Sequence, residues 1–355
     1  MNKRHVLLGI FAAITLASLI GTVTSRSGIA ADHIIRLSFL GSPKDEDHDG
    51  ALAFKEHVES HSNGRVEVAI YPSGQFCSNE RECIEGLQTG VLQVFPFTTG
   101  VLGTVFGPGQ ALDLPYIYRD DAVAECVLDG RIFDEVRSAI LAKGLNIRLM
   151  AVGNTGGWRN FASTGSEIRT PSDIRGRKIR TISAPVQQEL VRQFDGNPTP
   201  VAWSEVYTAL ATGVVEGTKN GIQDIVGMKL HEQIRFITLD GHSYMGQMWW
   251  FSEPSWQALP EDIQHIVYDG FQVLKMVTRE VVKRREIDAY QEFRESGGSI
   301  YVPSREEKDM FRDAAKGVRD WYSKTYGDEW LVKLDEAVGI CEMRIDAADR
   351  EAIKR

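Results

Sequence analysis

The sequence lacks the motifs that usually mark an enzyme. Its 355 residues contain no Gly-x-Ser-x-Gly turn, no glycine-rich phosphate loop ending in Lys-Ser or Lys-Thr, and no Cys-x-x-Cys pair. His231-Glu232 resembles the start of a zinc-binding helix, but Arg235 stands where the second histidine ligand would be. These absences argue against a hydrolase or a metalloenzyme, so we expect no catalytic residues, no metal and no cofactor.

The chain also lacks any concentration of positive charge. Its formal net charge is −9 and its pI is about 5.5, and the basic residues are scattered along the sequence. A nucleic-acid-binding protein normally gathers Lys and Arg on one face or in one stripe. Nucleic acid is therefore excluded as an expected partner.

Only one apolar run is long, and it lies at the N-terminus. Lys3 and Arg4 precede an uncharged apolar run from Val6 to Val23, and small residues follow as far as Ala30-Ala31. A basic start, an apolar middle and a small-residue exit are the parts of a secretory signal. We predict a signal peptide at 1–31 and export to the periplasm. The alternative is an uncleaved anchor, because the run approaches the roughly 20 residues that span a bilayer.

Cysteine is scarce, with four residues in the whole chain: Cys77, Cys83, Cys126 and Cys341. In an oxidising compartment the close pair Cys77 and Cys83 is predicted to form a small disulfide loop. The other two cysteines have no partner that is obvious from the sequence. The alternative is four buried thiols.

Strand and helix patterns alternate along the chain. β-branched and apolar segments bounded by Gly, Pro or Ser predict strands, and apolar residues at helical spacing predict helices. Strand, helix, strand is typical of an α/β fold with a mainly parallel sheet, whose ligands bind at the carboxyl ends of the strands. The pattern occurs twice, which predicts two lobes enclosing a solute. The predicted strands are 33–39, 66–71, 91–95, 145–152 and 236–240, and the predicted helices are 49–60, 80–89, 185–194 and 203–212.

One predicted helix is unusually long. Between Pro260 and Gly297 there is no proline and only one glycine, Gly270, and the apolar residues keep a helical spacing. A helix of roughly 35 residues would be about 50 Å long and would span both lobes. The alternative is two helices that break near Gly270.

A strand at 178–182 carries the main candidate for ligand binding. In Lys178-Ile179-Arg180-Thr181-Ile182 the alternation places Lys178, Arg180 and Ile182 on one face. A guanidinium group matches a carboxylate with two parallel hydrogen bonds, which fix direction as well as position. Arg180 is thus a candidate anion clamp, and the alternative is an ordinary solvated charge like Arg175.

Several motifs in order give the chain a recognisable family character. It resembles the extracytoplasmic solute-binding subunits of TRAP (tripartite ATP-independent periplasmic) transporters, of the dicarboxylate-binding-protein type. The resemblance covers nearly all of the chain after the predicted signal peptide. It rests on Tyr-Pro-Ser-Gly-Gln-Phe at 71–76, Leu-Asp-Leu-Pro-Tyr-Ile-Tyr at 112–118, the stretch 173–180, Pro-Thr-Pro at 198–200, and the segments 205–210 and 212–220.

The resemblance implies a role for five residues. Arg180 matches the arginine that pairs with the ligand carboxylate, and Arg159 and Asn220 match supporting ligand contacts. Trp203 stands where the family often places an aromatic wall, and His242 matches a position that often reaches the pocket. The alternatives are that Arg159 only forms an ion pair at the hinge and that Trp203 is a core residue.

The chain departs from the family pattern just before Asn220. The common sequence there is Gly-Gln-Glu, whereas this chain has Gly217-Thr218-Lys219. We expect Lys219 to face solvent, which leaves the ligand open. A second aromatic group either lines the site or packs at the hinge: Trp249, Trp250, Phe251 and Trp256.

These observations combine into one functional prediction. Lobe I is predicted at 32–157 and 246–285, lobe II at 158–245 and 286–340, and a C-terminal tail at 341–355. The resemblance implies a monomer that captures a small organic acid anion, such as a C4-dicarboxylate, by lobe closure. It then delivers the anion to TRAP membrane subunits for ion-gradient-driven uptake. The alternatives are a membrane-tethered periplasmic sensor and a periplasmic enzyme acting on an organic acid.

Overall fold

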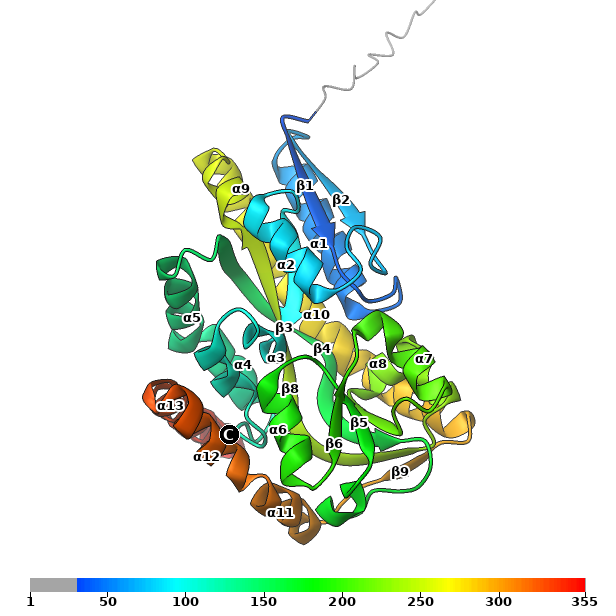
Figure 1. Cartoon of the computed structure of the whole chain (residues 1–355). Helices are drawn as coiled ribbons and strands as arrows, with labels where there is room; N and C mark the ends of the chain where they lie inside the picture. The colour runs from blue at the N-terminus through cyan, green and yellow to red at the C-terminus, as the bar shows by residue number, and fades with distance from the viewer. Residues whose placement is uncertain (1–30, 355) are drawn as a thin grey trace, which may run out of the picture. The chain divides into compact units, whose positions relative to one another are not determined.

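A single mixed sheet runs through residues 31–354, the part of the chain that the computed structural model describes (Figure 1). Residues 1–30 of the predicted signal peptide lie outside it. The strand order is β2-β1-β3-β8-β4-β7-β5-β6, and β9 pairs with β8. The strands are β1 (His33–Ser38), β2 (Val66–Tyr71), β3 (Val94–Thr98), β4 (Ile147–Ser163), β5 (Lys178–Thr181), β6 (Asn197–Pro200), β7 (Gly217–Asn220), β8 (Phe236–Ser252) and β9 (Ser299–Tyr301).

Strands β4 and β8 form the middle of the sheet. Each has 17 residues, and they pair antiparallel from Ile147 opposite Ser252 to Ser163 opposite Phe236. The neighbouring pairs β1–β2, β1–β3, β5–β6 and β5–β7 are parallel. The prediction of a mainly parallel sheet therefore holds for the two ends and is wrong for the middle. Both faces of β4 and β8 are buried, so their polar residues do not alternate with apolar ones and most of each strand escaped prediction.

Helices cover the sheet and connect its strands. The predicted helix at 80–89 is confirmed with the same ends, because Asn79 caps its first turn and Gly90 ends it with a left-handed φ of 78°. No described helix is both long enough and apolar enough to cross a membrane. The helices are α1 (Glu46–His61), α2 (Glu80–Thr89), α3 (Thr99–Leu102), α4 (Asp121–Asp129), α5 (Arg131–Ala142), α6 (Pro185–Gln193), α7 (Val206–Ala211), α8 (Ile222–Gly227), α9 (Glu253–Gln257), α10 (Glu261–Glu295), α11 (Arg305–Ala314), α12 (Lys316–Tyr326) and α13 (Glu329–Ile353).

Helix α10 confirms the predicted long helix. It is continuous over 35 residues and contacts α1, β4, α8 and β9. Gly270 does not break it. A Cβ atom at Gly270 would lie 2.9 Å from Cγ2 of Val58 and 3.1 Å from Cδ2 of Phe54, both on α1. The glycine therefore allows α1 and α10 to approach closely.

The aromatic residues of β8 belong to the hydrophobic core. Trp249 and Trp250 are fully buried, and Phe251 packs edge-on against Trp256 and Phe271. They lie in two core clusters, one built with α1 and α10 and the other with α4, α5 and α13. The core interpretation of these aromatic residues is the one that the structure supports.

Two disulfide bonds hold the described chain. The predicted bond between Cys77 and Cys83 is present, and Cys126 of α4 is bonded to Cys341 of α13. Helix α13 lies beside α4 (Figure 1). Position 341, where a C-terminal tail was predicted to begin, lies inside α13, which continues to Ile353.

Candidate functional site

A cavity of about 90 Å³ lies where both ends of the sheet meet β4 and β8. Ligand pockets commonly measure roughly 300 to 1,000 Å³, so a compact ligand is expected. Charged and polar side chains converge on the cavity, while apolar residues close the remaining wall. Its lining consists of Leu40, Gly41, Asp45, Asp47, Glu80, Phe95, Pro96, Phe97, Thr98, Val101, Thr155, Arg159, Arg180, Ile182, Trp203, Asn220, Asp224, Met245 and Gln247.

Arg180, on β5, forms part of the cavity wall and is only 2% exposed. Its Nε and Nη2 both donate to the carbonyl oxygen of Val201, at 3.0 and 2.9 Å. The guanidinium carbon lies over the ring of Trp203, 5.5 Å from its centre. Burial lowers the pKa of Arg180 to about 10, and Arg159 also lowers it. Within residues 31–354 no carboxylate forms an ion pair with this guanidinium (all ion pairs of the described chain lie elsewhere).

Arg159 and Asn220 come from the adjacent central strands β4 and β7. Arg159 is 3% exposed, and its Nη1 donates to the carbonyl oxygen of Lys219 at 3.0 Å. Its Nε is buried with no hydrogen-bond partner. Asn220 donates from Nδ2 to Asp224 at 3.1 Å and accepts from Thr218 at 2.8 Å. Four predicted residues, Arg159, Arg180, Trp203 and Asn220, therefore line one cavity.

Glycine places the backbone of β4 close to the acidic wall. Gly156 has a φ of 68°, in the left-handed region, and the register of β4 against β8 shifts between Asn154 and Trp158. A Cβ atom at Gly156 would lie 2.6 Å from the carboxyl group of Asp224. The Gly156 amide also donates to Oε1 of Glu46 at 3.0 Å. A larger residue at position 156 would therefore clash with the carboxyl group of Asp224.

Sequence reasoning missed the acidic side of the cavity. Asp45 and Asp47 come from the start of α1, and Asp224 comes from α8. Burial raises the pKa of Asp45 to about 6, and burial with neighbouring carboxylates raises the pKa of Asp47. Burial also raises the pKa of Asp224, while Asn220, Arg159 and Arg180 oppose that shift. The acidic run 45–49 was the available signal, but a helix N-terminus normally carries such residues for its own stabilisation. No group placed to ligate a metal occurs within 31–354.

His242 does not line the cavity. It is fully buried on β8, where its Nδ1 lies 2.7 Å from Oδ2 of Asp240. Its ring stacks obliquely on Phe161 at 4.7 Å. Burial lowers the pKa of His242, and the neighbouring Asp240 opposes that shift. The geometry thus places His242 in the supporting layer behind Arg159 and Lys219.

The expectation that Lys219 faces solvent is wrong. Lys219 is 2% exposed, and its Nζ donates to the backbone oxygen of Gln187 at 2.7 Å and to Oε1 of the same residue at 2.6 Å. All four residues of β7 are buried, so neither face of this strand offers a solvated position. Burial, together with Arg159, holds the pKa of Lys219 well below its usual value.

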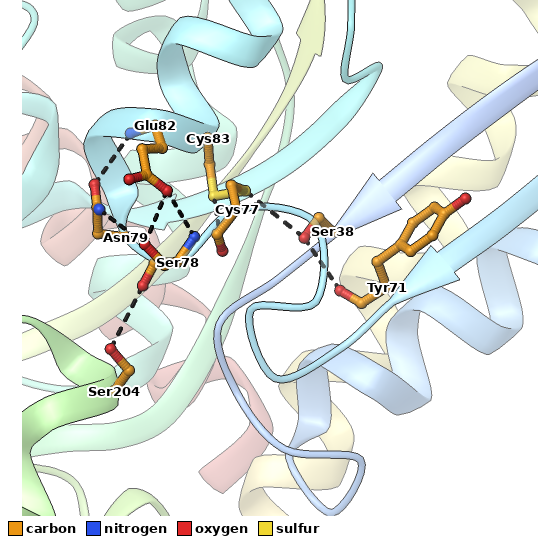
Figure 2. Close-up of a disulfide and its surroundings, with 8 residues drawn as sticks. All are labelled: Ser38, Tyr71, Cys77, Ser78, Asn79, Glu82, Cys83 and Ser204. Atoms are coloured by element: carbon orange, nitrogen blue, oxygen red, sulfur yellow. Dashed lines mark hydrogen bonds between the residues drawn. A yellow bond between two sulfur atoms is a disulfide. The ribbon is translucent and has the colours of Figure 1, made fainter.

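The Cys77–Cys83 loop closes one edge of the site. Figure 2 shows Ser204 pointing across to Ser78, whose carbonyl oxygen accepts from the Ser204 hydroxyl at 3.4 Å. Ser204 follows Trp203, and Glu80, inside the disulfide loop, lines the cavity. The disulfide thereby fixes a segment that contacts the opposite wall.

Comparison with known proteins places the chain in a family. Residues 38–325 match the family described as bacterial extracellular solute-binding protein, family 7. The chain belongs to this family. Among curated family-7 relatives, the C4-dicarboxylate-binding periplasmic protein DctP of Rhodobacter capsulatus is 26% identical over 92% of this chain and 98% of its own length. The 2,3-diketo-L-gulonate-binding periplasmic protein YiaO of Escherichia coli is 25% identical over 88% and 94%.

Solved structures agree with the family assignment. A TRAP periplasmic solute-binding protein from Sulfurospirillum deleyianum with bound succinate superposes with a TM-score of 0.80 at 25% identity, covering 86% of this chain and 98% of that chain. The similarity confirms the predicted class, a two-lobed α/β solute-binding fold. The two curated relatives are named for different acids, so similarity alone leaves the ligand of this family-7 chain undecided.

Proposed function

We propose that the protein captures a small organic acid anion whose carboxylate is held by Arg180, and delivers it to TRAP membrane subunits. One observation carries the proposal: a guanidinium group that is 2% exposed lines a cavity without an ion-pair partner among the described residues. A buried charge is costly unless it is paired. An anionic ligand supplies the negative charge that pairs with this guanidinium group, and this pairing favours binding.

The neighbouring groups support a carboxylate at that position. Arg159 has a buried Nε without an acceptor, on the wall shared with Arg180. Two guanidinium groups interact unfavourably at close range, and each lowers the cost of adding an anion beside the other. The side-chain amide of Asn220 lies on the same wall, and the Trp203 ring lies against the guanidinium group of Arg180. His242 lies behind this layer and contacts Asp240.

Lobe closure is the proposed mechanism of capture. The cavity wall combines residues of α1 and β3 with residues of β5 and β7, which lie on opposite sides of β4 and β8. Lobes I and II, with the predicted boundaries, would open about β4, β8 and α10. The ligand stabilises the closed form because only that form brings both walls into contact with it.

The location and partners follow from the same assignment. We place the mature protein in the periplasm as a monomer, exported by the segment at 1–31. The name of the Sulfurospirillum relative associates it with TRAP transport, and names of several relatives include the word periplasmic. Delivery to membrane subunits then requires no chemistry by this chain, in keeping with a family of solute-binding proteins.

The test is ligand binding by matched arginine variants. A thermal-shift screen of mono- and dicarboxylates, sugar acids and 2-oxo acids should find a ligand that raises the melting temperature. Arg180→Ala should weaken that ligand about a hundredfold or more, and Arg180→Lys about tenfold, because a bidentate pair is lost. Arg175→Ala removes an exposed arginine of the same segment and is the control. Unchanged affinity in Arg180→Ala would overturn the assignment.

A further inference from the structure

The cavity has a cationic side and an acidic side. Arg159 and Arg180 stand on β4 and β5, whereas Asp45 and Asp47 stand at the start of α1. None of the ion pairs within residues 31–354 joins either arginine to these carboxyl groups. The arginines and these carboxyl groups are therefore held apart by the fold, and both line the same cavity.

Two buried acceptors on the acidic side have no donor. Oδ1 of Asp47 and Oε1 of Gln247 are buried and make no hydrogen bond, although both side chains line the cavity. The two residues are 5% and 6% exposed. They are fixed by one bond, from Nε2 of Gln247 to Oδ2 of Asp47 at 2.7 Å. An unsatisfied buried acceptor is costly, so a molecule that donates hydrogen bonds at this end is favoured.

The charge of the wall selects among donors. Four acidic side chains and two arginines line the cavity: Asp45, Asp47, Glu80, Asp224, Arg159 and Arg180. A dicarboxylate would place its second negative charge beside Asp47 and Asp45, where the ionised forms of these residues would repel it. A hydroxyl group would satisfy the acceptors without balancing the charge. An ammonium group does both, because it offers three donors and a positive charge.

We propose that the ligand is a small zwitterion, whose carboxylate meets Arg180 and whose ammonium group meets Asp47 and Gln247. The inference rests on the proposed function and narrows its substrate class to compact amino acids and related zwitterions. It also accounts for the size of the cavity, about 90 Å³, which suits a ligand of few heavy atoms.

Binding of such a ligand is linked to protons. Burial raises the pKa of Asp47, as does the charge of Asp45, while the hydrogen bond from Gln247 opposes the shift. An ammonium group favours the ionised form of Asp47, so its binding releases a proton, and affinity rises as the pH increases through about 8, the pKa of Asp47. The groups that face Asp47 and Asp45 are Glu46 on α1, Asp224 on α8 and Arg285 on α10.

The test is a matched series of ligands. For chains of three, four and five carbon atoms, calorimetry on the purified protein would compare the ω-amino acid and the α-amino acid with the hydroxy acid and the dicarboxylate. We expect an amino acid to bind about tenfold or more tightly than its dicarboxylate counterpart. Calorimetry at about pH 6 in two buffers of different ionisation enthalpy should show that amino-acid binding releases about one proton.

A variant separates this inference from the proposed function. Asp47→Asn is nearly isosteric and keeps the acceptor for Gln247, so it should weaken amino acids about tenfold and leave hydroxy acids within about threefold. Retained binding of the hydroxy acid also shows that the variant is folded. If the protein prefers dicarboxylates or hydroxy acids and Arg180→Lys weakens their binding, the zwitterion proposal is overturned and the proposed function stands. Failure of every carboxylate in the series to bind would overturn both proposals.

Discussion

The guanidinium carbon of Arg180 lies 5.5 Å from the ring centre of Trp203, and both side chains line the same cavity. Trp203 also packs on the hydrophobic cluster formed around α7 and α8. The same residue thus fills two roles that the sequence presents as alternatives. It is a core residue on one side, and on the other it shields the charge that we assign to ligand binding.

Removal of the Trp203 ring should weaken ligand binding. Trp203→Ala loses a cation–π contact of about 1 to 2 kcal/mol, so the dissociation constant should rise roughly five- to thirtyfold, whereas Trp203→Phe should lose less. Calorimetry measures both. Trp256 offers a matched control, because Arg148 lies 5.6 Å from its ring and neither residue lines the cavity. Equal losses in Trp203→Ala and Trp256→Ala would contradict the shielding role.

The two disulfides should differ in their contribution to stability. The Cys126–Cys341 bond joins residues 215 apart in the sequence, and the Cys77–Cys83 bond joins residues 6 apart. Chain entropy predicts losses of about 5 kcal/mol and about 2 kcal/mol on replacement of each pair by serine. Urea unfolding of the two double variants checks the order, and a larger loss for the short loop would contradict it.

Loss of the short loop should also reduce ligand affinity. Ser78, inside it, accepts the hydrogen bond from Ser204 beside Trp203, as Figure 2 shows. Replacement of Cys77 and Cys83 by serine frees this edge of the cavity, so we expect affinity to fall about three- to tenfold, on the scale of one hydrogen bond. The Cys126 and Cys341 variant is the matched control, and it should bind normally at a temperature where it is folded.

Gly270 should resist substitution although it lies inside a helix. Alanine normally favours a helix over glycine by about 1 kcal/mol, but here its Cβ would lie 2.9 Å from Val58. Crowding of this kind costs about 1 to 3 kcal/mol, so Gly270→Ala should destabilise the protein. At Gly339 of α13 a Cβ atom meets nothing within 4 Å. Gly339→Ala should therefore stabilise, and the same sign for both variants in thermal unfolding would contradict the packing argument.

Lys219 should make the free energy of unfolding depend on pH. Burial holds its pKa in the folded protein below the usual value of 10.5, so the unfolded chain binds the proton more tightly. Its contribution to stability therefore increases as the pH rises from that lowered pKa towards 10.5. Lys219→Met removes this titrating group. Urea unfolding at about pH 7, 8 and 9 gives the free energy of unfolding at each pH, which should change less with pH in the variant than in the parent protein. An equal dependence on pH in the two proteins would indicate that Lys219 titrates normally.

Local patterns in the sequence were sufficient for the elements that depend on near neighbours. The ends of α2 follow from Asn79 and Gly90, and the unbroken apolar spacing predicts α10. The short separation of Cys77 and Cys83 makes their bond predictable. Arg159, Arg180, Trp203 and Asn220 were identified through the family resemblance, and the structure brings them to one cavity. Whether each contacts the ligand stays a prediction.

Tertiary structure alone decided the features that depend on distant pairing. The sequence by itself determined which residues are charged, where α2 begins and ends, that one long helix follows Pro260, and that Arg180 stands on a strand. Only the antiparallel pairing of β4 with β8, the burial of Lys219 on a central strand and the bond from Cys126 to Cys341 show what each residue contacts. The acidic wall opposite Arg180 belongs to this second group. A charge pattern is local, whereas its burial depends on which remote segments cover it.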